Sequence, residues 1–270
     1  LSTGSMAQIK SQLLDHVDIL PENVHAIPGD LSKENILTFC DDYEKLIASV
    51  GGIDIQVLGI GQCGNIAMNE PGTQANSSTR LVILDNNSRN DAKSLFGNAA
   101  QVPASAITLG IDTILQATEV VLLAFGQHKA NIVKQAIEGT ASPACPASLL
   151  QLHKNASVAL DLDAANLLTR INHPWKVTNC EWTDQLVRRA VVWLCEETKK
   201  PILKLTNKDY NDYGLSELIT KYESAYNCNI KVFNDLQHTI TGWPGGKPNA
   251  DDTNRPERAN PFPKDIVIFS

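Results

Sequence analysis

The stretch IDIQVLGIGQCGNIAMNEPGT, residues 53–73, decides the fold class of this chain. Residues 53–60 are rich in β-branched side chains and almost continuously apolar, which is typical of a parallel strand covered on both faces. The strand runs directly into a glycine-rich loop that contains Gly59, Gly61 and Gly64. Because α/β proteins bind ligands beyond the C-terminal ends of parallel strands, the sequence predicts a binding site at this loop.

Strand and helix patterns alternate on both sides of this stretch. Before it, apolar residues at helical spacing predict a helix at 36–47, which begins after an N-cap at Ser32. Further strands are predicted at 24–27, 81–84, 107–109, 119–125 and 156–160, and further helices at 129–138 and 148–152. Alternation of this kind favours an α/β fold with a mostly parallel sheet flanked by helices.

The pattern changes after residue 168. Trp175, Trp182 and Trp193 lie close together, whereas residues 1–174 contain no tryptophan. The remaining elements are predicted as a helix at 184–200 with Thr183 as its N-cap, a strand at 202–205, a helix at 215–225 and a strand at 230–233. We therefore expect a C-terminal α/β extension at 169–240.

Composition bounds the classes of function. The chain has 270 residues, 43% of them hydrophobic and 20% charged, and a net charge of −7. This is an ordinary globular mixture, which excludes intrinsic disorder of the whole chain. No apolar run is long enough for a membrane helix, and an acidic chain offers no basic face to phosphate backbones. We therefore expect neither a membrane nor a nucleic acid as partner.

The six cysteines are scattered singly, without a CxxC pair and without a histidine at zinc-site spacing. Cysteines in this arrangement are expected to be reduced thiols of a cytoplasmic protein, and the chain begins without a signal peptide. Disulfides stay open as the less favoured alternative, because the number of cysteines is even. The six histidines form no ligand-spaced set, so we predict no metal site.

The glycine loop by itself is weak evidence, because a tight strand-to-helix turn also needs glycines. A dinucleotide cofactor is disfavoured for two reasons. Asn69, Glu70 and Pro71 interrupt the apolar helix that should follow the loop, and no acidic residue lies at the required spacing on a following strand. We therefore expect no cofactor.

The loop at 59–72 resembles the signature of the glucosamine-6-phosphate deaminase/isomerase family, which reads roughly G-[IV]-G-x-D-G-H-I-A-F-N-E-P. The resemblance continues through 78–84 and 102–139 and covers about 5–163. The related 6-phosphogluconolactonases have a similar glycine loop but lack Asn-Glu-Pro at this spacing. The resemblance implies a Rossmann-like fold of the sugar-phosphate isomerase type for residues 1–168. It also implies that the N-terminal part of that domain is missing, since a P-T-G-x-T-P loop and an Asp-Glu-Tyr segment are not found.

In this family the loop supplies an Asp, a His and a Glu, which align with Cys63, Asn65 and Glu70. The resemblance makes these three the candidate catalytic residues, and it makes Gly59, Gly61, Gly64 and Lys129 the candidate substrate-binding residues, with Lys129 on the phosphate. Asn65 cannot exchange a proton near neutral pH, and general acid–base catalysis typically contributes about 10²–10⁴-fold. Cys63 is either a thiol that titrates or a small buried filler.

The resemblance implies a glucosamine-6-phosphate deaminase/isomerase that acts on amino-sugar phosphates in carbohydrate metabolism, with an altered acid/base loop. The alternative is a catalytically impaired domain that binds the sugar phosphate and is fused to a deacetylase. Residues 241–270 resemble the junction to a PIG-L/LmbE-type deacetylase, so a linker and the first strand of a following domain are expected there. The sequence leaves homo-oligomerisation open.

Overall fold

The structure is a computed structural model that describes residues 5–29, 31–32, 34–98 and 101–241. The chain divides into two compact units, Leu1–Ile171 and Asn172–Ser270. This division lies close to the predicted boundary after residue 168. The assignment of residues 241–270 to a linker and a further strand falls almost wholly outside the described residues. In the described part, no helix is long and apolar enough to cross a membrane.

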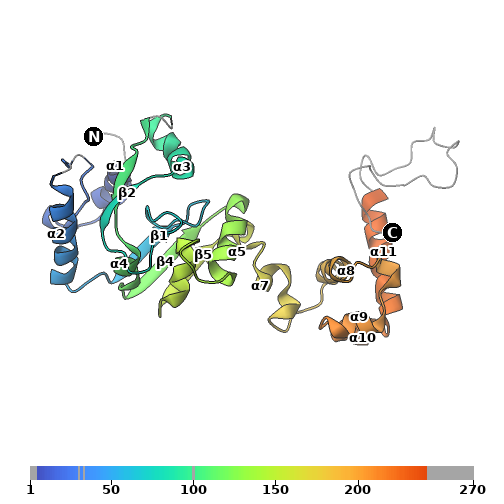
Figure 1. The fold of residues 1–270 in the computed structure, drawn as a ribbon. Helices are drawn as coiled ribbons and strands as arrows, with labels where there is room; N and C mark the ends of the chain where they lie inside the picture. The colour runs from blue at the N-terminus through green and yellow to red at the C-terminus, as the bar shows by residue number, and fades with distance from the viewer. Residues whose placement is uncertain (1–4, 30, 33, 99–100, 242–270) are drawn as a thin grey trace, which may run out of the picture. The chain divides into compact units, whose positions relative to one another are not determined.

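A parallel sheet organises the first unit. Its three strands are β1 (Ile55–Gly59), β4 (Glu119–Ala124) and β5 (Ala156–Leu160), in the order β1-β4-β5, and Figure 1 shows them side by side. Both strand pairs are parallel, and the register sets Gly59 opposite Leu123. The α/β class and the parallel sheet are therefore confirmed.

The core of this unit lies on one face of the sheet. Alternate residues of β4 (Val120, Leu122 and Ala124) are buried against helices α4 (Ile111–Leu115) and α5 (Ala130–Glu138). The 3₁₀ helix η5 (Pro146–Leu152) adds further buried residues in place of the helix predicted at 148–152. On β1 the alternate positions Ile55 and Val57 keep 61% and 56% of their surface exposed. The sheet is thus covered on the core face and open at these positions of its edge strand, so the prediction that this strand is covered on both faces is wrong.

Two predicted strands lie outside the parallel sheet. Strands β2 (Arg80–Ile83) and β3 (Ser105–Thr108) pair with each other in antiparallel fashion. Helix α3 (Asn86–Phe96) follows β2 directly, and its N-cap Asp85 accepts a hydrogen bond from the Ser88 N–H at 2.7 Å. The sequence located these strands, but their pairing is a result of the structure.

The N-terminal segment differs in two details from the prediction. Helix α1 (Ser5–Gln12) is followed by the 3₁₀ helices η1 (Leu14–His16) and η2 (Pro21–Asn23), and no strand forms at 24–27. Helix α2 (Ile36–Ser49) has Asn35 rather than Ser32 as its N-cap, without a side-chain hydrogen bond. The Glu44 carboxylate of α2 accepts bonds from the Thr79 N–H and the Thr113 hydroxyl at 2.7 and 2.6 Å. These bonds tie α2 to the unit.

The second unit is helical in its described residues, so the predicted α/β extension is wrong there. Its main elements are α8 (Asp184–Thr198), η7 (Ile202–Lys204), α9 (Asn207–Asp212), α10 (Ser216–Tyr222) and α11 (Ala225–Thr241). The strand predicted at 202–205 is a 3₁₀ turn, and 230–233 lies inside α11. Ala225, Cys228 and Val232 are buried at helical spacing, and this period, rather than the short apolar run, decides the element.

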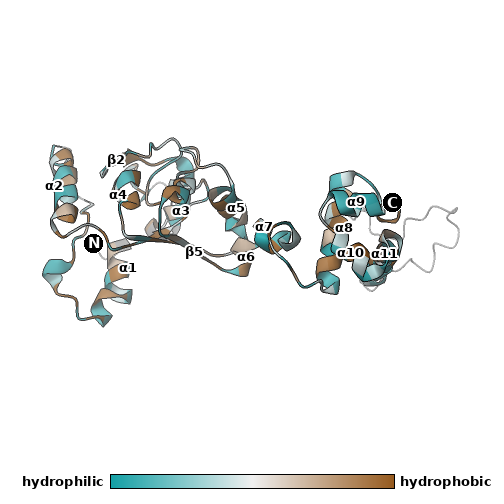
Figure 2. Cartoon of the chain, turned by 90° about the horizontal axis from the view of Figure 1, so that it is seen from below, coloured by the Kyte–Doolittle hydropathy of each residue, from teal (hydrophilic) through white to brown (hydrophobic). Residues whose placement is uncertain are grey.

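Helix α8 forms where the sequence predicted a helix. Thr183 caps it, accepting a hydrogen bond from the Leu186 N–H at 3.3 Å. Apolar and polar positions alternate around the helix (Figure 2), and the buried side packs into a core with Tyr210 of α9. Burial raises the pKa of the Tyr210 hydroxyl, which donates to Asn229 Oδ1 at 2.7 Å.

The short helices η4 (Gln127–Lys129), α6 (Leu162–Ala165), α7 (Thr169–Asn172) and η6 (Pro174–Lys176) complete the described elements.

Candidate functional site

The candidate site begins where β1 ends. The chain turns back on itself after Gly59, so that Ile60 and Ile66 form an isolated antiparallel bridge. Inside the turn, the Gly61 N–H donates to the Asn65 carbonyl at 2.9 Å and the Gly64 N–H donates to the Gly61 carbonyl at 3.0 Å. These two N–H groups are therefore used by the loop itself, and a contact of Gly61 or Gly64 with substrate would have to use another part of the backbone.

Two of the glycines lie in close packing. Gly64 has φ +80°, and a Cβ there would lie 2.5 Å from the Cys145 Sγ. A Cβ at Gly61 would lie 1.9 Å from the Asn65 Oδ1. Beside Gly59, by contrast, a Cβ would meet nothing within 4 Å. Burial raises the pKa of the Cys145 thiol, which therefore stays neutral beneath the loop.

The base of the loop is fixed by Asn69, which is fully buried. Its amide donates to the carbonyl of Ile66 at 3.1 Å and to the carbonyl of Leu109 at 2.8 Å. The next residue, Glu70, thereby begins a second turn, which is closed by the hydrogen bond from the Thr73 N–H to the Glu70 carbonyl at 3.0 Å. In this turn the Gly72 N–H donates to the Pro143 carbonyl at 2.8 Å. The Asn-Glu-Pro segment is thus part of the site's frame.

The side chains of the loop contact the first turns of α3. Asn65 Nδ2 donates to Ser88 Oγ at 3.3 Å, and Asn87 Nδ2 donates to Cys63 Sγ at 3.5 Å. Further along α3, Gln62 Nε2 donates to Asp91 Oδ1 at 3.0 Å. The structure therefore brings the candidate residues Cys63 and Asn65 together along one helix.

Glu70 also faces α3, at its N-cap. Its Oε1 lies 3.5 Å from the Asp85 N–H, at the limit of a hydrogen bond. Its Oε2 is buried and has no hydrogen-bond partner among the described residues. A buried carboxylate oxygen without a partner is costly, so this atom needs a hydrogen-bond donor beyond those that the described residues supply.

Lys129 reaches the loop from the other side. It ends the 3₁₀ helix η4, and its Nζ donates to the Ile60 carbonyl at 2.8 Å, directly after β1. The preceding turn is held by Asp161, whose two carboxylate oxygens accept from the Gly126 N–H at 3.0 and 2.9 Å. Lys129 is half-buried, so its ammonium is a positioned charge rather than a solvated one.

The part of the site that the sequence did not reveal is the start of α3. Asp85, Asn87 and Ser88 hold the loop, yet they lie outside the glycine motif. The signal was available, because DNNS at 85–88 follows a predicted strand and has an N-cap residue three positions before a serine. Contact between this cap and the loop depends on the fold and could not be inferred from spacing.

The comparisons with known proteins agree with this architecture. The family described as glucosamine-6-phosphate isomerases/6-phosphogluconolactonase matches residues 3–159. A solved structure of a monomeric glucosamine-6-phosphate deaminase of the NagB superfamily is 37% identical with a TM-score of 0.57, covering 59% of this chain and 66% of that chain.

Two curated relatives extend the comparison. A protein of Bacteroides thetaiotaomicron, whose name calls it glucosamine-6-phosphate deaminase-like, is 60% identical over 97% of this chain and 40% of its own length. A glucosamine-6-phosphate deaminase of Shewanella woodyi is 45% identical over 60% of each chain. The chain thus spans less than two thirds of either relative. With the family match over more than half of its residues, this chain belongs to the family of glucosamine-6-phosphate isomerases and 6-phosphogluconolactonases.

Proposed function

We propose that this chain binds an amino-sugar phosphate and supports glucosamine-6-phosphate deaminase/isomerase chemistry through an altered acid/base loop. The observation that carries the proposal is the position of Lys129, whose Nζ lies 2.8 Å from the Ile60 carbonyl at the glycine loop. Ligands of α/β proteins bind at this end of a parallel strand, and a lysine there supplies a point charge for phosphate. The relatives named for this activity favour the same substrate class.

Three side chains of the loop are the candidates for the chemistry: Glu70, Asn65 and Cys63. Glu70 is the carboxylate, and its partnerless Oε2 is the atom that we assign to the substrate or to a proton in transfer. Asn65 can donate or accept a hydrogen bond at a sugar oxygen but cannot carry a proton between atoms. Cys63 is half-buried, and its sulfur accepts a weak hydrogen bond from Asn87. As a free thiol, it is the second group in the loop that we assign to proton transfer.

A second candidate is a domain that binds the sugar phosphate without converting it and serves a fused deacetylase. It is favoured by Asn65, because the amide that stands at the expected histidine is bonded to Ser88 and offers no acid. The same relative of Bacteroides thetaiotaomicron is much longer than this chain, which leaves room for a further domain in a protein of this kind. The deacetylase itself stays a prediction, as does the cytoplasmic location.

One experiment separates the two candidates. The full-length protein is incubated with glucosamine 6-phosphate, ammonia release is measured, and binding of the same compound is followed by calorimetry. Binding together with ammonia release above background supports the deaminase. Binding without ammonia release supports the second candidate. Absence of both contradicts a sugar-phosphate site in either form.

A further inference from the structure

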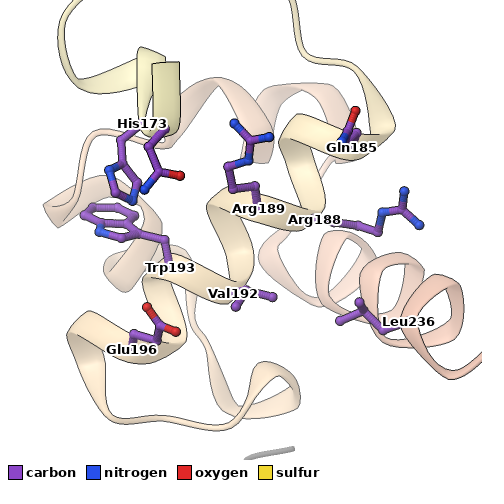
Figure 3. A pocket seen from close by; sticks show the side chains of 9 residues that line it. His173, Gln185, Arg188, Arg189, Val192, Trp193, Glu196 and Leu236 are labelled. Atoms are coloured by element: carbon purple, nitrogen blue, oxygen red, sulfur yellow. The ribbon is translucent and has the colours of Figure 1, made fainter. Parts of the chain in front are cut away.

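The helical unit contains a pocket that the proposed function does not use. Its volume is about 400 Å³, and the side chains of nine residues line it (Figure 3). Helix α8 supplies most of the lining from one face, at the helical spacing of Gln185, Arg188, Arg189, Val192, Trp193 and Glu196. The volume lies in the range of sites that hold small metabolites.

The lining carries more positive than negative charge. Arg188 and Arg189 contribute two guanidinium groups, whereas Glu196 is the sole carboxylate among the nine lining residues, all of which the structure describes. Figure 3 shows Arg189 on the side of His173 and Arg188 on the side of Leu236. With the described residues Arg188 makes no hydrogen bond and no ion pair, so its five donors are available to a ligand.

Both arginines neighbour the same point on the helix surface. Val192 follows Arg188 by four positions and Arg189 by three, and residues at these spacings lie side by side on a helix. Val192 is 37% exposed and forms an apolar part of the floor. The two guanidinium groups extend to different sides of the pocket, with Val192 between their side-chain bases.

The neighbouring wall is aromatic and held in place. The rings of His173 and Trp193 lie 5.7 Å apart, and Trp193 also packs against Trp175 at 5.6 Å and Tyr213 at 5.9 Å. Trp193 lines the pocket but is only 7% exposed, so most of its side chain lies in the core. Lys176 Nζ, 4.9 Å from the Trp193 ring centroid, adds a third cation beside this wall. A wall packed in this way is preorganised for a ligand.

We propose that this pocket binds a small phosphorylated metabolite of hexose-phosphate size, with its phosphate at Arg188 and its carbon skeleton against His173 and Trp193. A phosphate presents several oxygens to the planar fork of Arg188, which suits it better to this net positive lining than a neutral group. The site lies within the second unit and is distinct from the glycine loop, which belongs to the first.

Tryptophan fluorescence tests this site selectively. Within residues 1–270 all four tryptophans follow residue 174, so the emission of this 270-residue chain reports on the second unit, and Trp193 lies in the pocket itself. The 270-residue chain carrying Lys129→Ala is titrated with glucose 6-phosphate, glucose and inorganic phosphate. The Lys129→Ala background weakens binding at the loop, so the result does not depend on the proposed function.

We expect a saturable change of emission with glucose 6-phosphate, weaker binding of inorganic phosphate and none of glucose. Arg188→Gln should weaken glucose 6-phosphate binding roughly 10- to 100-fold, as expected for one charge-assisted contact, and Arg188→Lys should lose less. Lys204→Gln removes an exposed cation of the same unit outside the pocket and should leave the affinity unchanged. No saturable change with glucose 6-phosphate, equal binding of glucose, or unchanged affinity after Arg188→Gln overturns the proposal.

Discussion

Residue 65 is an amide whose nitrogen donates to Ser88 Oγ and whose oxygen fills the space beside Gly61. Both contacts position it, and neither gives it a proton to exchange. In the family that this chain resembles, the aligned position holds a histidine. The substitution therefore changes the chemistry of the loop more than its shape.

Asn65→His together with Cys63→Asp should raise ammonia release from glucosamine 6-phosphate, because an imidazole oriented by a carboxylate can open the sugar ring. The gain of the double variant should exceed the sum of the two single variants, and we expect at least about tenfold of the ~10²–10⁴-fold that acid–base catalysis supplies. Initial rates across pH 5–9 check this, because the new activity should titrate near the histidine pKa of about 6.5.

Asn65→Gln is the matched control, since it keeps an amide and should bring no gain. If the double variant still binds the sugar phosphate but is no more active than the parent, residues 63 and 65 do not hold the catalytic positions.

A buried carboxylate in the second unit gives a residue-level prediction for stability. Asp209 accepts from Lys200 Nζ at 2.8 Å and from the Thr206 N–H and hydroxyl at 2.8 Å each. The hydrogen bond from Lys200 is the main cause that lowers the pKa of this carboxyl. Asp209→Asn should cost about 1–3 kcal/mol of unfolding free energy at pH 7.

Because the folded pKa of Asp209 is lowered, its contribution is present above the unfolded pKa of about 3.9 and is lost as the pH falls through the folded pKa. The difference between wild type and Asp209→Asn in urea unfolding should therefore shrink from pH 7 toward pH 3. Asp212 is 52% exposed and forms a surface ion pair with Lys208, so Asp212→Asn should cost little unfolding free energy at either pH. A pH-independent loss in Asp209→Asn would contradict the assigned role of its charge.

At the scale of elements, the glycine loop depends on how closely it packs on η5. Gly64 has a positive φ, and a Cβ added there would meet Cys145. Gly72 has φ +96°, but a Cβ added there would meet nothing within 4 Å. Gly64→Ala therefore adds a steric clash to the backbone strain, and Gly72→Ala adds the strain alone. The two variants separate the effects of conformation and packing in one loop.

We expect Gly72→Ala to cost about 1–2 kcal/mol and Gly64→Ala about 1–3 kcal/mol more. Denaturant unfolding followed by far-UV circular dichroism measures both. Gly64→Ala/Cys145→Ala should recover most of the difference, because it removes the atom that the new Cβ meets. Equal costs for the two single variants would show that Cys145 does not restrict the loop.

For the whole molecule, the sequence predicted elements whose signals are local and strong. Strands β1, β4 and β5 were found because each is a short, mainly apolar segment, although of the three only β4 has alternate residues buried along its whole length. Helix α8 was found from its apolar period and its Thr183 cap. The predicted strands 202–205 and 230–233 were wrong because four residues, three of them apolar, fit a strand and a buried helix face equally. The helical period of Ala225, Cys228 and Val232 would have decided the second case.

The candidate site could likewise be predicted only in part from the sequence. The loop residues could be named from the sequence, because they share one motif. Their contacts with Asp85, Asn87 and Ser88 could not, since these pairs are set by how β2 and α3 return to the sheet. Likewise, the antiparallel pairing of β2 with β3 joins segments more than 20 residues apart, which no local pattern specifies.

The measurement that tests the central claim most directly is calorimetric binding of glucosamine 6-phosphate to the full-length protein and to its Lys129→Ala variant. Loss of one charge-assisted contact to phosphate should weaken binding by about 1.5–3 kcal/mol. Lys134→Ala removes an exposed lysine of the adjoining helix α5 and should leave the affinity as in wild type. Affinity that is equal in wild type and Lys129→Ala would contradict a phosphate site at the glycine loop.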